Sequence, residues 1–224
     1  MENLTDNIDD GDAGNLFMIK LKILLIGLIC SAGLMLSCST GVEPSPEAAL
    51  LRVTLQAAPS DSTIRIATQT MYASPDDSLQ INIFQGRAFS DSNYAVLRQR
   101  RDELFPQDHQ YNILKRDSVN QLKRYTIFEY YVPPGEYDSL RFGISADFML
   151  LTYGYTYGGI GVPMESPEGM NLLETIPVRY SMSEGELTEI NLHLKPFASV
   201  ERYRDLFLFT PQLEVVSTKN LGPY

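Results

Sequence analysis

From Ala49 onward, apolar and polar residues alternate along much of the chain, and a period of two is typical of β-strands with one buried face. Leu51, Val53 and Leu55 alternate with polar side chains in the first such segment. The same alternation returns in six later segments, at 64–66, 79–83, 140–144, 176–180, 190–194 and 213–215. This pattern predicts an all-β domain in which each strand has one face in the core and one in water.

Five Asp-Ser pairs accompany these segments, at 61–62, 77–78, 91–92, 117–118 and 138–139. Both side chains form hydrogen bonds with nearby backbone groups and so favour turns between strands. The alternative is a calcium site, which needs several oxygen ligands within one loop. Because no D-x-D-x-[DN]-G pattern occurs, we interpret the pairs as turns.

Two stretches lack the alternation, and we expect them to be helical. Tyr94–Phe105 would form a short helix ended by Pro106, and Val200–Leu206 would form another turn or two. Both lie between predicted strands. The sequence therefore predicts an antiparallel β-sandwich of about seven to nine strands with short helical insertions.

The N-terminal region contains a different pattern. Lys20 and Lys22 precede Ile23–Leu36, a run of 14 residues without a charge. At 1.5 Å per residue this run is too short to cross a hydrocarbon core of about 30 Å as a helix. Its length is typical of the apolar region of a signal peptide.

The apolar run ends in Leu34-Met35-Leu36-Ser37-Cys38, which resembles the bacterial lipobox. The resemblance implies cleavage before Cys38, lipid attachment to its thiol, and a place in the bacterial cell envelope, with Ser39 favouring the outer membrane. The alternative is an uncleaved anchor, because the uncharged stretch continues to Val42. Cys30 fits the motif less well, since the bulky Ile29 precedes it.

These features divide the chain into four parts. Residues 1–37 would be the signal peptide. A translation start at Met18 is the alternative, because the first 17 residues hold five acidic residues where a signal peptide should be positive. Residues 38–48 would be the lipidated cysteine and a proline-containing tether. Residues 49–218 would be the sandwich, and residues 219–224 a tail.

Composition excludes several classes of protein. The chain has 18 Lys and Arg against 28 Asp and Glu, a net charge of −10, which argues against nucleic-acid binding. Two cysteines are too few for a disulfide framework or a Cys-rich zinc module. The glycine motifs of nucleotide-binding proteins, G-x-x-x-x-G-K-[ST] and G-x-G-x-x-G, do not occur, so the sequence predicts no cofactor.

One turn is more specific than the others. In the segment 132–141, Pro133 and Pro134 restrict φ, Gly135 allows a positive φ, and Tyr137 enters the next strand, where its ring packs on the sandwich edge. This turn resembles the proline-x-glycine-x-tyrosine hairpin of prealbumin-like and carboxypeptidase-regulatory-like sandwiches.

Residues 50–216 also resemble an uncharacterised family of bacterial lipoprotein domains. The first strand ends in Ala57-Ala58-Pro59, and the last contains Pro211. Together the resemblances imply a prealbumin-like or immunoglobulin-like Greek-key sandwich in the envelope, and they transfer no active site.

Candidate catalytic groups are sparse. The two histidines, His109 and His193, lie far apart in the sequence, and a hydrolase would need one of them beside a carboxylate and a Ser or Thr in a cleft. The acidic pairs Asp76-Asp77 and Glu184/Glu186 lie in predicted turns, where they would face water. We therefore expect a protein that is not an enzyme, with a divergent envelope hydrolase as the alternative.

Tyr153, Tyr155 and Tyr157 form the feature with most binding potential, because on a strand their rings would share one face. Such a row suits a glycan or protein surface. The alternative, which we favour, is an aromatic ladder that covers the sandwich edge. The sequence thus predicts a lipid-anchored binding module with an unidentified envelope protein or glycan as partner.

Overall fold

The computed structural model describes residues 47–66, 69–99, 110–152, 159–166, 172–203 and 206–224. This part of the chain contains strands and no helix, so the all-β prediction is confirmed. The strands are β1 (Ala49–Ala57), β2 (Thr63–Ile66), β3 (Gln69–Tyr72), β4 (Ser78–Ser90), β5 (Asn93–Val96), β6 (Gln110–Asn112), β7 (Tyr125–Val132), β8 (Gly135–Leu151), β9 (Ile160–Glu165), β10 (Leu173–Met182), β11 (Glu186–Leu194), β12 (Val200–Tyr203), β13 (Leu206–Phe209) and β14 (Leu213–Pro223).

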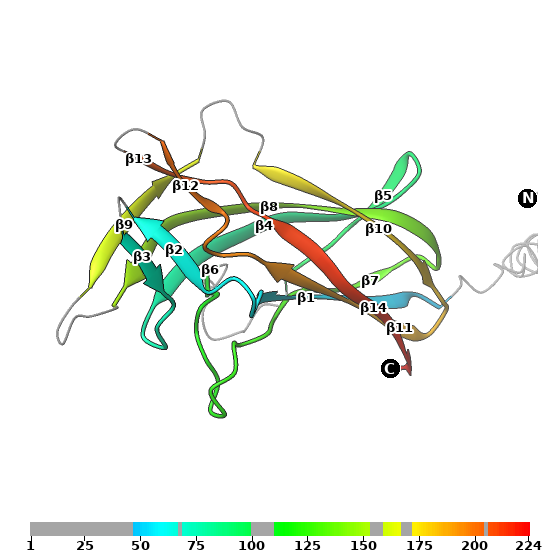
Figure 1. The fold of residues 1–224 in the computed structure, drawn as a ribbon. Helices are drawn as coiled ribbons and strands as arrows, with labels where there is room; N and C mark the ends of the chain where they lie inside the picture. The colour runs from blue at the N-terminus through cyan, green and yellow to red at the C-terminus, as the bar shows by residue number, and fades with distance from the viewer. Residues whose placement is uncertain (1–46, 67–68, 100–109, 153–158, 167–171, 204–205) are drawn as a thin grey trace, which may run out of the picture. The chain divides into compact units, whose positions relative to one another are not determined.

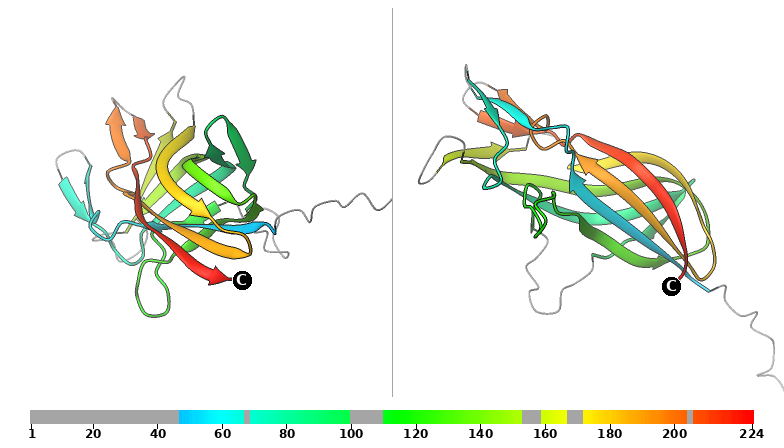
Figure 2. Two further views of the ribbon diagram at one scale, coloured as in Figure 1. Left: turned by 90° about the vertical axis from the view of Figure 1, so that its right-hand side faces the viewer. Right: turned by 60° about the horizontal axis from the view of Figure 1, so that its bottom comes forward.

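The strands form two large sheets and one small hairpin. The first sheet has the order β14-β11-β1-β7, and the second has the order β12-β13-β9-β8-β4-β5, with β10 also paired to β8 and β6 to β4. The hairpin β2-β3 stands apart. The two large sheets face each other in a sandwich-like arrangement, which two further views also show (Figures 1 and 2).

One hydrophobic core lies between the two sheets. The apolar positions of the alternating segments point into it, and Leu51, Val53 and Leu55 of β1 are fully buried. Phe128 of β7 lies 5.7 Å from Phe142 of β8, between ring centroids, and so joins the two sheets. Each such side chain contributes about 1.5–3 kcal/mol by leaving water.

The expectation of a purely antiparallel sandwich needs correction at two places. β1 and β11 pair in parallel, from Leu50 opposite Leu187 to Ala57 opposite Leu194, and β9 and β13 also pair in parallel. Parallel neighbours require a long crossover connection. Here the chain visits the second sheet between β1 and β11, which supplies that crossover.

The predicted helical insertions are wrong where the structure describes them. Residues 93–96 form β5, which pairs with residues 87–90 of β4, and residues 200–203 form β12, which pairs with β13. Residues 100–109 lie outside the described residues. Pairing with a neighbouring strand satisfies the backbone groups of these short segments and overrides their weak helical pattern.

The last strand is longer than its alternating segment. β14 continues to Pro223, which lies opposite Glu186 in the ladder, so residues 219–223 of the expected tail belong to the first sheet. Residues 1–46, with Cys38, lie outside the described residues. No helix in the described ranges is long and apolar enough to span a membrane.

The start of the domain, the β7–β8 turn, the β10–β11 turn and the C-terminus gather at one end, here named the entry end. Ala49 lies opposite Val132, and Leu50 lies beside Leu187 at the start of β11. β8 runs from this end through 17 residues to Leu151 at the far end. Figure 1 shows both chain ends of the domain on the same side.

Candidate binding groove

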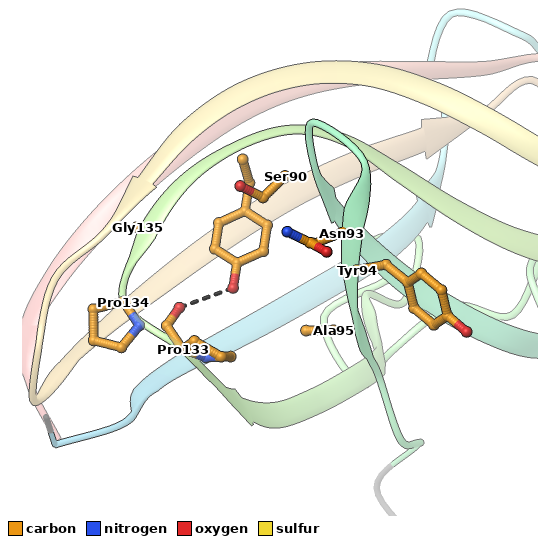
Figure 3. Close-up of a pocket in the computed structure, with 8 residues that line it drawn as sticks. Ser90, Asn93, Tyr94, Ala95, Pro133, Pro134 and Gly135 are labelled. Atoms are coloured by element: carbon orange, nitrogen blue, oxygen red, sulfur yellow. Dashed lines mark hydrogen bonds between the residues drawn. The ribbon is translucent and has the colours of Figure 1, made fainter. Parts of the chain in front are cut away.

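Two turns at the entry end frame a groove of about 320 Å³. One turn joins β4 to β5 within the second sheet, and the other joins β7 of the first sheet to β8 of the second. The groove is lined by Ser90, Asn93, Tyr94, Ala95, Pro133, Pro134, Gly135 and Tyr137 (Figure 3). Three sequence-predicted residues, Pro134, Gly135 and Tyr137, therefore lie together in its wall.

The β7–β8 turn is held by its glycine and its tyrosine. Gly135 has a φ of +149°, a conformation that disfavours other residues, although a Cβ there would meet no atom within 4 Å. The Tyr137 hydroxyl donates a 2.8 Å hydrogen bond to the carbonyl of Pro133 (Figure 3). The Tyr137 ring stacks on Tyr180 of β10, with centroids 5.3 Å apart and planes at 11°. These contacts fasten the turn to β8 and β10.

Burial also determines the protonation of the two stacked tyrosines. It raises the pKa of Tyr137, and it raises the pKa of Tyr180 further, with smaller contributions from Tyr137 and the Asp138 carboxylate. Both phenols are therefore neutral at pH 7. A neutral hydroxyl that donates to a backbone carbonyl positions the turn and supplies no base.

The β4–β5 turn forms the opposite wall. Asp91 has a φ of +52°, and its backbone N–H donates a 3.1 Å hydrogen bond to the Asp138 carboxylate of β8, which ties the two turns together. Asn93 points toward the β7–β8 turn, whereas Tyr94 points away from it (Figure 3). The groove thus presents an amide and a hydroxyl between proline and tyrosine surfaces, a lining that suits a neutral polar ligand segment.

A second depression adjoins the groove and is more polar. It shares Ser90 and Tyr137 with the groove and adds Asp91, Glu136, Asp138 and Arg179. In the described part of the chain, no group of three or more His, Cys, Asp or Glu side chains is placed to hold a metal ion. The acidic side chains of this depression, Asp91, Glu136 and Asp138, therefore place negative charge beside the groove.

The structure describes the surroundings of the tyrosine row but not the row itself. Tyr153, Tyr155 and Tyr157 lie outside the described residues, as does His109. The flanking strands β8 and β9 pair in antiparallel register, from Phe148 opposite Pro163 to Leu151 opposite Ile160.

Asp77 has a structural role at the end of β8. The expectation that it faces water is wrong, because Asp77 is buried. Its carboxylate accepts hydrogen bonds from the Ser74 N–H and from both the N–H and the hydroxyl of Thr152, at 2.7, 2.7 and 2.9 Å. These three bonds fasten the β3–β4 turn to the residue that precedes the tyrosine row. Asp76, its neighbour, is exposed.

The remaining candidate acids and His193 occupy the surface. Glu184 accepts the Glu47 N–H, and Glu186 accepts the Asn220 amide. Hydrogen bonds from Asn220 and Ser183 lower the pKa of Glu186. The Nδ1 atom of His193 lies 3.8 Å from the Glu214 carboxylate on the outer face of the first sheet, and His193 lines none of the described pockets.

Sequence reasoning missed the β4–β5 half of the groove. Asp91-Ser92 was a turn signal, but nothing in the sequence relates it to Pro133 and Pro134, some forty residues later. Comparison with family models, with curated proteins and with solved structures gives no significant match for this chain.

Proposed function

We propose that this chain is a lipid-anchored protein of the bacterial cell envelope, placed in the outer membrane, whose sandwich is a non-catalytic binding module. The Ser37-Cys38 motif after the uncharged run supports the anchor. The groove between the β4–β5 and β7–β8 turns carries the binding role, because one wall is a turn within the second sheet, the other is the turn that connects the two sheets, and the Asp91–Asp138 hydrogen bond ties the first turn to β8.

We also propose that the sandwich is prealbumin-like. Two features support this assignment. The Pro133-Pro134-Gly135 turn passes the chain from one sheet to the other, with Tyr137 packed directly behind it. The first strand lies inside the four-stranded sheet between the parallel β11 and the antiparallel β7.

The anchor would keep the groove close to the membrane. A tether over residues 38–48 spans at most about 36 Å when fully extended, at about 3.3 Å per residue. The domain starts at the entry end, where the groove lies. A ligand of the groove would therefore be an envelope component near the lipid surface, either a protein or a glycan.

Acyl labelling tests the anchor. Cells that express the full chain are given labelled palmitate, and we expect Cys38→Ala to lose the label and leave the membrane fraction, since stable attachment depends on the acyl chains. Cys30→Ala is the matched control and should keep the label. Label retained by Cys38→Ala contradicts the proposal.

Filling the groove tests the binding role. In the full chain captured from intact envelopes, Asn93→Tyr places a ring in the groove, whereas Ser118→Tyr adds the same ring at an exposed loop position. We expect Ser118→Tyr to retain the partners of the wild type and Asn93→Tyr to lose them. Equal capture by both variants, with equal melting temperatures, contradicts a binding role for the groove.

The tyrosine row remains a second candidate site, for carbohydrate. The hydrogen bonds of Asp77 to Thr152 favour it, because they hold the segment that leads into the row. Replacing Tyr153, Tyr155 and Tyr157 together by Ser should abolish glycan binding at an unchanged melting temperature if the row is a platform. A lower melting temperature with unchanged binding identifies an edge-covering ladder instead.

A further inference from the structure

Two arginines face each other across the centre of the second sheet. Arg87 of β4 and Arg141 of β8 are directly opposite in the antiparallel ladder. Side chains in this relation stand on the same face with their Cβ atoms about 5 Å apart, and like charges there repel. The arrangement is unexpected in a chain with a net charge of −10, which offers an excess of carboxylates.

Both arginines lie on the outer face of the sheet. Their neighbours in the chain, Ala88, Leu140 and Phe142, are buried in the core, whereas both arginines are partly exposed. The row across the sheet runs from Val96 on β5 through the two arginines to Thr175 on β10.

Neither guanidinium has an anionic partner in the described part of the chain. Arg52 and Lys195, in contrast, each form an ion pair with a carboxylate in that part of the chain. The Nε atom of Arg141 is buried and has no hydrogen-bond partner. A buried N–H of a charged group without an acceptor is costly, and an acceptor supplied by a ligand removes that cost.

An aromatic surface adjoins the pair. The Arg87 guanidinium lies 4.7 Å from the centroid of the Tyr94 ring, and Phe89 packs against the same ring at 5.5 Å. A guanidinium stacked on a ring keeps its N–H donors in its own plane, where they can reach an oxyanion. Tyr94 remains 51% exposed and Val96 55% exposed, so a ligand bound at the arginines has an apolar surface beside it.

We propose that Arg87 and Arg141 bind the oxyanion group of an acidic saccharide, whose ring lies on Tyr94. A carboxylate or phosphate between the two guanidinium groups neutralises their repulsion and accepts from the Arg141 Nε–H, because the arginine fork matches both oxyanions. A sugar ring presents its C–H groups to the tyrosine face. This site lies on the outer sheet face and does not depend on the lipid anchor; it shares Tyr94 with the lining of the groove, whereas both arginines lie outside that lining.

Calorimetric titration of the full-length protein in nonionic detergent tests the site. The probes are an oligomer of galacturonic acid, a neutral galactose oligomer of equal length, inorganic phosphate, and phosphoglycerol, which is the soluble headgroup of an anionic lipid. The variants are the double change Arg87→Gln/Arg141→Gln and Arg141→Lys, which keeps the charge but removes the fork. Arg65→Gln, an exposed arginine on β2, is the matched control.

We expect the galacturonic acid oligomer to bind the wild type and Arg65→Gln equally, and the neutral oligomer to bind neither. The double variant should lose about tenfold or more in affinity, the effect of losing at least one charged hydrogen bond. Its melting temperature should be unchanged or higher, because the repulsion is gone. Arg141→Lys should also bind more weakly than the wild type, and this variant decides the matter if the double variant does not fold.

Three results overturn the proposal. The first is that the acidic oligomer does not bind the wild type. The second is that it binds the arginine variants as tightly as the wild type. The third is that phosphoglycerol or inorganic phosphate binds as tightly as the oligomer, because the site would then recognise a headgroup or a free anion and make no use of the sugar.

Discussion

The outer faces of the two sheets differ in what surrounds their arginine side chains. On the first sheet, the Nε–H of Arg52 on β1 donates to the Glu129 carboxylate at 2.6 Å. The terminal Nη1 atom of Arg52 lies 3.6 Å from the Glu189 carboxylate. On the second sheet, Arg141 has Arg87 on one side and Thr175 on the other. Among the described residues, the arginine of the first face is paired with carboxylates of its own sheet, whereas the second face sets two arginines side by side, which is why we propose that an anion from outside the chain binds there.

The uncharged polar groups on the outer face of the first sheet also find partners within that sheet. The Thr54 hydroxyl donates to the Asn191 side-chain oxygen at 2.6 Å, and the Asn191 amide donates to the Ser217 hydroxyl at 3.0 Å. Thr54 and Asn191 are buried although they belong to the outer face. Polar groups there act as cross-strand links from β1 to β14.

The largest effect in this comparison is expected from Asn191→Leu. The change leaves the buried Thr54 hydroxyl without an acceptor, and we expect a loss of about 1–3 kcal/mol in the free energy of unfolding, measured by urea denaturation. Asn82→Leu on the second sheet is the control, because Asn82 bonds only to the exposed Asp147. A cost of Asn82→Leu as large as that of Asn191→Leu would remove the distinction between the two faces.

Arg52→Gln should have a smaller effect. It leaves Glu129 and Glu189 facing each other on either side of β1, and we expect a loss of about 1 kcal/mol or less, since the groups are partly exposed. The loss should shrink in 1 M salt, where the Debye length is about 3 Å. A loss that does not depend on salt would show that the arginine stem, rather than its charge, stabilises the sheet.

Arg141→Gln should cost nothing, or raise the stability by about 0.5 kcal/mol or less, because it removes a like-charge contact. The same urea denaturation measures it, side by side with Arg52→Gln. Destabilisation of more than about 1 kcal/mol would mean that Arg141 has a structural partner, and the two faces would then be equivalent.

The smallest effect concerns Glu174, which precedes Thr175 on β10. Burial raises the pKa of its carboxyl, and no lowering by an arginine accompanies it. A raised carboxyl pKa favours the protonated folded state, so its contribution to stability is present at low pH and is lost as the pH rises through the folded pKa. Glu174→Gln should therefore flatten the decline in stability above about pH 4.5. A wild-type stability that rises in this range because of Glu174 would indicate that a neighbouring positive charge, rather than burial, determines the pKa of Glu174.

Much of the fold could be predicted from local pattern. Each of the seven alternating segments lies within a strand, because one buried face imposes a period of two. β7 was not predicted, since Tyr125–Val132 has aromatic residues on both faces and a register shift opposite Val53 and Thr54. β12 was predicted as helical because a four-residue strand is decided by its partner, β13.

The candidate sites divide in the same way. One wall of the groove could be predicted from Pro134, Gly135 and Tyr137, because a proline-glycine turn is encoded by neighbouring residues. The other wall, from Ser90 to Ala95, became adjacent only when β4 paired with β8. The arginine pair gives no signal at all in the sequence, because Arg87 and Arg141 are more than fifty residues apart.

The sequence by itself determined the properties that depend on neighbours along the chain: the strand period, the turn at Gly135, the acidic balance and the predicted lipid attachment at Cys38. Only the tertiary structure decided which strands are neighbours, including the parallel pairing of β1 with β11. Register then set Arg52 between two glutamates and Arg141 against a second arginine. The physical reason is that a shift of one residue moves every side chain to the other face, and the buried core alone selects the register.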